Sequence, residues 1–542
     1  MSNILKYSLF GSAFVLIGLL VGFKIKDAAP AGINSGLMKF ERALRFIESN
    51  YVEELDEDKI VDDAIEGVLE GMDPHSFYIP ASEMKQMREQ MAGSFDGIGV
   101  QFNILEDTIY VEAPISGGPS EKLGIMSGDR IIGVDGENVA GIGITNADVM
   151  GLLKGPKGSE VDVTILRRAT AKALEFTIER DRIPLNSLDF AYMMDPETGY
   201  IKINRFSETT YAEFLEALEM LQDKGMSQLI LDLRGNPGGY MEMSRKMADE
   251  FLSAGKVIVS TEGRIRQSKQ EYRSTSSLGT FEKGPLVVLI DYGSASASEI
   301  VSGAVQDHDR GLIVGVRSFG KGLVQIQEEF DDGSAMRIVI SKYYTPSGRC
   351  IQKPYDKSDA EYADEIAARF ESGEIFDESK IVIPDSLKFN TASGRIVYGG
   401  GGIYPDVFVA NDTTGGSAYL TELQMNDLFR KFSFQYVDAR PELMKRYSSP
   451  EAFLKDFNLS ASLVNQFTAF AGEKGVAFDD AEYQKSKRLV DNRIKAYIGR
   501  RMYNDDGFFP VLNQVDKVIQ EAYKLMPEAA RLERTGKVSM ND

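Results

Sequence analysis

The chain has 542 residues, 43% of them hydrophobic and 26% charged, a composition typical of a folded protein with several domains. Its net charge of −21 would repel a phosphate backbone, so we expect no nucleic-acid partner. The single cysteine, Cys350, excludes an internal disulfide, and two histidines leave few ligands for a zinc ion. We therefore expect no metal and no cofactor, although a metal site made of carboxylates alone stays open.

The N-terminus combines basic residues with an apolar run. Lys6 precedes the run Tyr7–Phe23, and two lysines follow it closely. The run is at the short end of the ~17–25 residues of a membrane-spanning helix. The segment Ala28–Ala31 matches a small-residue cleavage site only loosely. We therefore predict that residues 1–26 are an export signal kept as an inner-membrane anchor, with the rest of the chain in the periplasm. If the signal is cleaved, the protein is soluble in the periplasm.

Residues 34–92 are predicted to be helical. Leu37, Phe40, Leu44 and Ile47 recur at the spacing of one helix face. The segment Asp73-Pro74-His75-Ser76 interrupts the pattern, because a proline cannot continue a helix.

Residues 93–182 change to short strands and glycine turns. The loop Gly97-Ile98-Gly99-Val100 precedes one strand, and Gly128–Gly136 reads Gly-Asp-x-Ile-x-x-Val-Asp-Gly. Together these segments resemble a PDZ domain, in which loop amides, here those of Ile98, Gly99 and Val100, bind a terminal carboxylate. We expect the short helix at Ala147–Leu153 to add an apolar pocket from Val149, Leu152 or Leu153. Taken alone, Ile98 and Val100 also fit plain core packing.

Strands and helices alternate over residues 183–410. Gly199–Asn204 and Gln228–Arg234 are predicted strands, followed by helices at Tyr211–Gly225 and Tyr240–Leu252. Alternation of this kind predicts an α/β core with largely parallel central strands. The acidic stretch at about 354–396 reads as an insertion in this core, and residues 411–542 read as an all-helical region.

Three serines lie where a predicted strand gives way to a helix. Ser294, Ser296 and Ser298 stand between the apolar strand Pro285–Ile290 and the helix beginning near Ile300. Backbone amides at such a junction have no helical acceptor, so they can stabilise an oxyanion beside a nucleophilic serine. Each of the three serines also fits a helix N-cap, and the residues alone do not choose among them.

The base for such a serine is better sought among lysines than among the two histidines. Lys321 and Gln325 lie four residues apart around the start of the predicted strand Leu323–Phe330. Burial would lower the pKa of a lysine, and a glutamine could hold the amine without restoring a charge. On its own, Lys321 also fits a solvated surface lysine. We expect His308 to point away from Ser296 and His75 to be structural.

These segments resemble the tail-specific, or carboxyl-terminal processing, serine proteases over about residues 34–410. The resemblance implies a crotonase-like ββα protease core, so the predicted fold class is multidomain α/β with a helical N-terminal segment, a PDZ-like domain and a helical C-terminal region. It implies Ser296 as nucleophile, Lys321 as base and Gln325 as its support. The amide of Ala297, with that of Gly238 or Gly239, would form the oxyanion hole. The motifs that carry the family resemblance are Asp73-Pro74-His75-Ser76, the PDZ-like unit, Leu231–Gly239, Ser294–Glu299, Ser318–Gly322 and Tyr344–Arg349.

The expected function is that of a serine endopeptidase that cleaves exported proteins and recognises their free, apolar C-termini through the PDZ-like unit. The alternative is a catalytically silent adaptor that uses this unit only to bind C-termini. The intact set of Ser296, Lys321 and Gln325 favours the enzyme. A homo-oligomer stays open, because the sequence does not reveal the oligomeric state.

Overall fold

A computed structural model describes residues 33–115, 117–167, 172–275, 279–355, 362, 364–410, 412 and 415–537. The chain divides into two compact units, Met1–Asp73 and Pro74–Asp542. The predicted N-terminal signal or anchor at 1–26 lies outside the described residues. Within the described ranges, no helix is both long and apolar enough to cross a membrane.

The described part of the first unit contains two helices, α2 (Ile33–Asn50) and α3 (Glu57–Glu70). The apolar spacing that predicts α2 is therefore confirmed as helical. Asp56 caps α3 by accepting a hydrogen bond from the Lys59 amide, as an N-cap aspartate does.

The expectation of helix throughout 34–92 is wrong at one point. Phe77–Ile79 form a short strand, β1, which pairs antiparallel with β18 (Ala335–Tyr344). Aromatic and β-branched side chains favour this extended pairing over a helix. The helix α4 (Ala81–Ala92) then begins directly after Pro80.

The PDZ-like unit is an antiparallel sheet in the order β3-β4-β5-β7-β8, with β6 on β5. Its core is formed by the inward residues of the strands together with Val149 and Leu153 of α6 (Asn146–Leu153). β2 pairs with β9 where the chain enters and leaves the unit. The strands are β2 (Ser94–Gly97), β3 (Val100–Leu105), β4 (Thr108–Pro114), β5 (Arg130–Val134), β6 (Glu137–Asn138), β7 (Glu160–Leu166), β8 (Leu174–Glu179) and β9 (Asp181–Pro184).

The larger core holds a six-stranded sheet in the order β10-β11-β12-β15-β16-β21. Pairing is parallel from β11 to β21, and β10 adds an antiparallel edge. The predicted parallel α/β core is therefore confirmed. The strands are β10 (Leu188–Met193), β11 (Thr198–Ile203), β12 (Gln228–Asp232), β15 (Leu286–Ile290), β16 (Leu312–Gly315) and β21 (Val407–Phe408).

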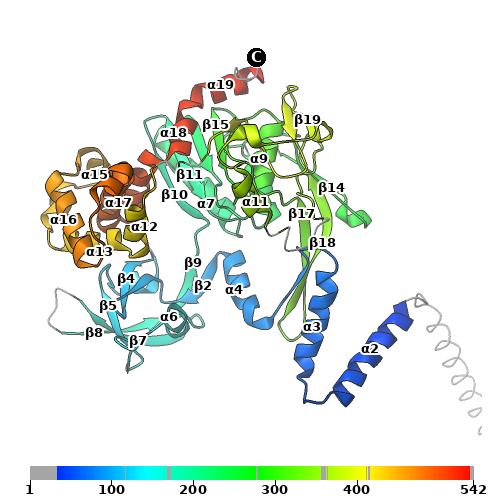
Figure 1. Cartoon of the computed structure of the whole chain (residues 1–542), viewed down its shortest axis with the longest axis horizontal. Helices are drawn as coiled ribbons and strands as arrows, with labels where there is room; N and C mark the ends of the chain where they lie inside the picture. Colours follow the sequence, from blue (N-terminus) through cyan, green and yellow to red (C-terminus); the bar gives the residue numbers. More distant parts are fainter. Residues whose placement is uncertain are drawn as a thin grey trace, which may run out of the picture. The chain divides into compact units, whose positions relative to one another are not determined.

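Helices bury both faces of this sheet. One face packs on α7 (Thr210–Asp223), α8 (Met241–Asp249) and α9 (Ala297–Asp307). The other packs on α18 (Lys517–Lys524) and α19 (Met526–Thr535), drawn in red above the sheet in Figure 1. Successive side chains of a strand point to opposite faces of the sheet. In β12, Leu229 and Leu231 therefore face the first helix layer, and Ile230 faces the second.

The last two helices thus complete the sheet layer, whereas the sequence indicated only a general helical region at 411–542. A parallel sheet must be covered on both faces, and the helices next to it in sequence cover only one. Apolar residues of α18 and α19 supply the missing cover, with Ile519, Ala522, Ala529 and Leu532 fully buried.

The remaining C-terminal helices, α12 to α17, form an aromatic core of their own around Phe453 and Phe467. They contact the PDZ-like unit through arginines. Glu112 of β4 pairs with Arg430 and Arg500, each at 3.4 Å. Arg501 donates to Ser127 Oγ at 2.9 Å. The helices are α12 (Ala418–Met425), α13 (Leu428–Asp438), α14 (Glu442–Arg446), α15 (Pro450–Asp456), α16 (Ala461–Glu473) and α17 (Asp480–Leu512).

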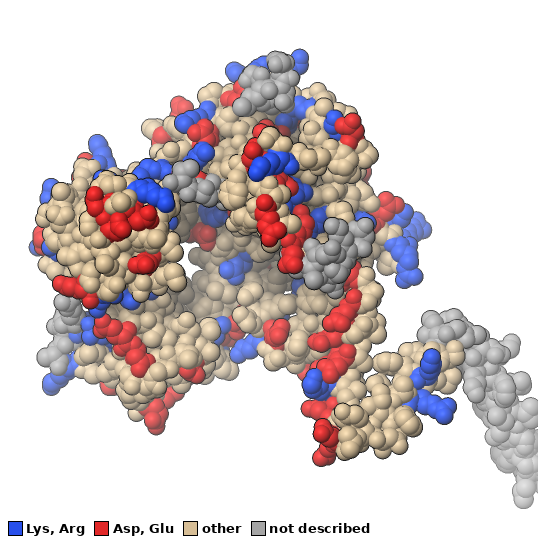
Figure 2. Space-filling model, in the orientation of Figure 1, with Lys and Arg blue, Asp and Glu red and all other residues tan. Residues whose placement is uncertain are grey.

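A second sheet flanks the core in the order β1-β18-β13-β14, with β17 (Leu323–Glu329) on β18. β13 is Val257–Gly263 and β14 is Gln270–Arg273. The predicted insertion at 354–396 contains α11 (Glu365–Ser372) and β19 (Lys388–Asn390). β19 pairs with β20 (Ile396–Tyr398), which begins at the end of the insertion. Acidic side chains are spread over the PDZ-like unit, the C-terminal helices and the core on the face seen in Figure 2.

Candidate active site

Ser296 stands at the junction of the fully buried strand β15 and helix α9. Its backbone has φ +53° and ψ −109°, a left-handed conformation that costs energy for a side chain other than glycine. Such strain persists only where neighbours hold it in place. The Ser296 amide donates to Glu299 Oε2 at 2.8 Å, and the Tyr343 hydroxyl lies 3.0 Å from the Ser296 carbonyl oxygen.

The two neighbouring serines serve the local structure. Ser294 is fully buried and donates to the Leu233 carbonyl at 2.9 Å. Ser298 is fully buried and donates to the Asn236 carbonyl at 3.0 Å. Of the three, Ser296 is the one that lines a large cleft.

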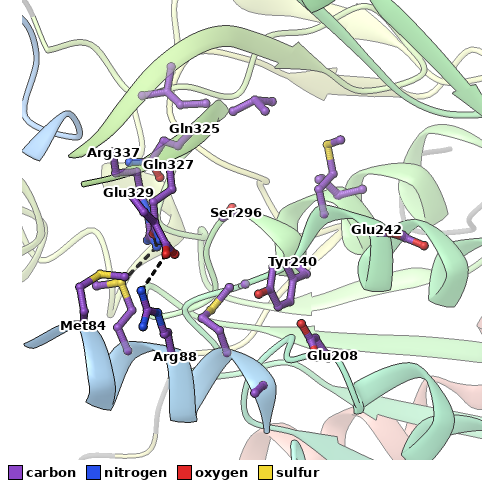
Figure 3. Close-up of a pocket in the computed structure, with 18 of the residues that line it drawn as sticks. Met84, Arg88, Glu208, Tyr240, Glu242, Ser296, Gln325, Gln327, Glu329 and Arg337 are labelled. Atoms are coloured by element: carbon purple, nitrogen blue, oxygen red, sulfur yellow. Dashed lines mark hydrogen bonds and ion pairs between the residues drawn. The ribbon is translucent and has the colours of Figure 1, made fainter. Parts of the chain in front are cut away.

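This cleft has a volume of about 630 Å³. In Figure 3, Ser296 lies between Gln325 of β17 and Tyr240 at the start of α8. The wall on the α4 side carries methionines, which adapt to apolar groups of different shapes. Residues lining the cleft include Met84, Met87, Arg88, Met91, Glu208, Gly239, Tyr240, Glu242, Ser296, Leu323, Gln325, Glu329, Arg337 and Tyr343.

The turn after β12 packs against the nucleophile candidate. A Cβ on Gly238 would come within 2.8 Å of Ser296 Cβ and 2.9 Å of the Ala297 nitrogen, so only glycine allows this approach. The Gly238 amide donates to Asn236 Oδ1 at 2.9 Å, whereas Gly239 lines the cleft. Ala297 is the first residue of α9, where the amide has no acceptor within the helix.

The fully buried carboxylate of Glu299 joins Ser296 to the Lys321 segment. Oε2 accepts from the amides of Ser296 and Lys321, at 2.8 and 2.9 Å. Oε1 accepts from the Gly320 amide at 2.7 Å and from Ser318 Oγ at 2.5 Å. Burial raises the pKa of Glu299, while these hydrogen bonds act in the opposite direction.

Sequence reasoning missed Glu299 as a site residue. Its position three residues after Ser296 follows the serine–glutamate spacing of a helix start and could have pointed to it.

Lys321 lies half-buried at the other end of this carboxylate bridge. The Tyr343 hydroxyl lies 2.8 Å from the Lys321 carbonyl oxygen, so one phenol contacts both the Ser296 and the Lys321 backbone. Burial raises the pKa of Tyr343 well above its ordinary value, which keeps its proton available for donation.

Gln325 lines the cleft, and its side-chain amide donates to the His75 carbonyl at 2.5 Å. Its Oε1 is then the atom that can accept a hydrogen bond. The two histidines do not flank Ser296. His75 Nε2 shares a hydrogen bond with Tyr362, and His308 Nε2 contacts the Val257 carbonyl at 2.6 Å.

The PDZ-like unit presents a second cavity of about 330 Å³. It is lined by the predicted loop residues Ile98, Gly99 and Val100 and by Leu153. Val149 is fully buried in the core, and Met150 lines the cavity instead of Leu152. Ile98 also packs into the core of the unit, so the core-packing interpretation is confirmed. The binding of a carboxylate by the Ile98 amide stays a prediction.

Helix α4 lies between the two cavities. Met84, Met87, Arg88 and Met91 line the cleft at Ser296, whereas Gln86, Glu89 and Gln90 line the PDZ groove. Within each set the residues recur at intervals of three or four, so each set lies on one face of the helix, and the two sets lie on different faces. Glu89 pairs with Lys154 of the PDZ-like unit at 2.6 Å.

Among the residues that the structure describes, no cluster of three or more His, Cys, Asp or Glu side chains is arranged to hold a metal ion. The groups hydrogen-bonded to the Ser296 backbone include the buried Glu299 carboxylate and the Tyr343 phenol, and Glu299 also binds the Lys321 amide.

Comparisons with known proteins match separate parts of the chain. Residues 197–361 match peptidase family S41, residues 110–167 match a PDZ domain, and residues 23–82 match the N-terminal domain of the activating protease CtpB. Residues 419–504 match a family of unknown function, DUF8443.

Whole-protein relatives agree with these matches. The chain is 37% identical to the carboxy-terminal processing protease CtpA of Bacillus subtilis, covering 58% of this chain and 66% of that protein. It is 37% identical to a carboxy-terminal-processing protease of Bartonella bacilliformis, over 58% of this chain and 72% of that protein. It is 36% identical to CtpB of Bacillus subtilis, over 64% of this chain and 73% of that protein.

Among solved structures, the photosystem II D1 C-terminal processing protease matches with 28% identity and a TM-score of 0.32, over 57% of this chain and 88% of that one. The resemblance drawn from the sequence and the predicted fold class are confirmed by the family models and the curated relatives.

We predict that Glu299→Gln lowers kcat/KM by about 10-fold or more. The amide side chain has one acceptor oxygen, so donors on its other side lose their partner, at a cost of about 1–3 kcal/mol. The matched control is Glu242→Gln, which removes a carboxylate from the same cleft but not from the bridge. Peptidase assays would compare both variants with wild type, and equal rates in all three would contradict a role for the bridge.

Proposed function

Because this chain belongs to the carboxy-terminal processing proteases of peptidase family S41, we propose that it is an endopeptidase with Ser296 as nucleophile and Lys321 as general base. The observation that carries this assignment is the Glu299 bridge. It ties the strained backbone of Ser296, in the cleft, to the amide of Lys321. In this proposal Gln325 Oε1 accepts a hydrogen bond from the lysine amine, while the Gln325 side-chain amide donates to the His75 carbonyl.

In this mechanism, the neutral amine of Lys321 accepts the proton of Ser296 Oγ as Oγ bonds to the scissile carbonyl carbon. The protonated lysine then donates to the leaving amine as the C–N bond breaks. The neutral Lys321 amine then takes a proton from a water molecule as the water oxygen bonds to the acyl carbon. The protonated lysine returns a proton to Ser296 Oγ as the ester bond breaks, which releases the new C-terminus and restores the enzyme.

The oxyanion would be held by the Ala297 amide at the start of α9 and by one glycine amide. The observations favour Gly239 over Gly238, because the Gly238 amide already donates to Asn236 Oδ1 and Gly239 lines the cleft.

We further propose that the substrates are polypeptides whose free C-termini bind the PDZ groove at Ile98, Gly99 and Val100. The apolar lining by Met150 and Leu153 supports a preference for apolar terminal side chains. The neighbouring α4 supports a short path for the chain from the groove to Ser296, since the helix borders both cavities.

We predict that Ser296→Ala abolishes cleavage of an unfolded protein substrate while the melting temperature stays close to that of wild type, because only one hydroxyl in the cleft is removed. Ser302→Ala, on the buried side of the same helix, is the control for loss of a hydroxyl. Cleavage by Ser296→Ala at the wild-type rate would refute the assignment. Binding of C-terminal peptides without cleavage by wild type would favour the adaptor.

We predict that Lys321→Arg is as inactive as Lys321→Ala, because a guanidinium stays protonated throughout the working pH range. The exposed Lys342, on β18, provides the control substitution Lys342→Arg. The measurement is kcat over roughly pH 6 to 10, the range in which a lysine of lowered pKa titrates. A Lys321→Arg enzyme with near-normal kcat would show that a neutral amine is not required.

The PDZ assignment predicts that a peptide with a free apolar C-terminus is cleaved faster than its amidated form or a form ending in two aspartates. Met150→Ala should raise KM for the free peptide by about 10-fold, since it removes roughly 1–2 kcal/mol of apolar contact. Leu152→Ala, two residues along the same helix, is the matched control. Equal rates for all three peptides would mean that the unit does not read C-termini.

For location, we propose an exported protein anchored in the inner membrane by the apolar run at Tyr7–Phe23, with its catalytic part in the periplasm. This proposal is supported by the short, positively charged segment with Lys6 before that run. Fractionation and N-terminal sequencing provide the test. We expect an unprocessed protein in the membrane fraction; recovery in the cytosol would refute export, and a mature N-terminus near residue 30 would refute only the retained anchor.

A further inference from the structure

The acidic insertion at 354–396 contacts the backbone of the segment that carries Lys321. Arg369 of α11 is almost completely buried. Its guanidinium donates to the Ser318 carbonyl at 2.7 Å and to the Phe319 carbonyl at 3.2 Å. Glu365, one helical turn earlier, holds that guanidinium at 2.7 Å. The insertion therefore fixes the two residues that precede Gly320 and Lys321.

The same insertion reaches Gln325 through a second route. The Tyr362 hydroxyl lies 2.6 Å from His75 Nε2, and the two rings meet edge to face at 5.1 Å. The His75 carbonyl in turn accepts the Gln325 side-chain amide at 2.5 Å. Tyr362 therefore contacts His75, and His75 in turn positions Gln325.

A third residue joins the same hydrogen-bond network. Gln352 Nε2 lies 3.4 Å from the Tyr362 hydroxyl oxygen and donates to it. The Tyr362 hydroxyl therefore links Gln352 to His75. Gln352 also accepts the Gly322 amide at 2.8 Å, so it contacts the Lys321–Gln325 segment as well.

We propose that the insertion is a clamp on the Lys321–Gln325 segment, with Tyr362 and Arg369 as positioning residues for the base. Neither residue contacts the substrate in this role. The proposal rests on the proposed function, in which Lys321 is the base and Gln325 its support.

The clamp matters because proton transfer requires the base and the nucleophile within hydrogen-bond reach, and a displacement of about 1 Å can cost on the order of 100-fold in rate. Ser296 is held by Glu299 and Tyr343, which also contact the Lys321 backbone. The insertion is a further support on the Lys321–Gln325 segment. Loosening the insertion should therefore displace the base more than the nucleophile. The PDZ groove, which is lined by other elements, should be unaffected.

The test uses the full chain and the variant Tyr362→Phe, which keeps the ring and removes the hydroxyl. We expect kcat to fall by about 10-fold, with KM, the affinity of the PDZ groove for a C-terminal peptide and the melting temperature unchanged. The rate at which a fluorophosphonate labels Ser296 should fall in parallel with kcat. Tyr398→Phe, in β20 just after the insertion, is the control and should match wild type.

Arg369→Lys gives a second, independent measurement should Tyr362→Phe not fold. A lysine keeps the positive charge but can reach fewer of the carbonyls, so we expect an intermediate kcat, while Arg369→Gln should lose more. Wild-type kcat and labelling in Tyr362→Phe and in Arg369→Lys would overturn the clamp. So would a loss of activity that only follows a loss of folded protein. Full activity of Ser296→Ala would instead refute the proposed function on which the clamp depends.

Discussion

One buried carboxylate determines the geometry of the candidate active site. Glu299 accepts four hydrogen bonds, and these come from both sides of the site, from the start of α9 and from the loop before β17. An ionisable group is costly to bury unless its oxygens are paired. Here the pairing itself fixes the distance between two segments that are separated by more than twenty residues. The strained Ser296 backbone is stable because it is one of the partners.

The protein around this site is organised by the demand for cover on both faces of a parallel sheet. Helices that alternate with the strands cover the face that carries α9, and the chain returns from its C-terminal end to cover the other. The helices α18 and α19 therefore help to stabilise the core, and the C-terminal helices before them contact the PDZ-like unit. Their arginines on Glu112 join the same chain segment to the unit that we propose selects substrates.

Local sequence patterns predicted much of this. Buried strands such as Leu286–Ile290 and the PDZ segments have strong local signals, and both are present as expected. The role of Glu299 and the return of α18 and α19 depend on partners far away in sequence, which periodicity does not reveal. The same holds for β1, whose partner β18 lies more than 250 residues later. In the PDZ helix, Leu153 lines the cavity as expected, whereas Met150 lines it in place of Val149 and Leu152. A step of about 100° per residue moves a side chain to another helix face, so neighbouring positions are easily confused.

Helix α4 separates two cavities for which we propose different functions. Its methionine face borders the space beside Ser296, and its polar face borders the space beside the loop Ile98–Val100. Because one helix borders both cavities, any rigid displacement of α4 that widens one cavity narrows the other. If substrates bind as we propose, long peptides in the groove and bulky side chains in the cleft would therefore compete for the same position of the helix. The volume available at one end of such a substrate would then depend on what is bound at the other end.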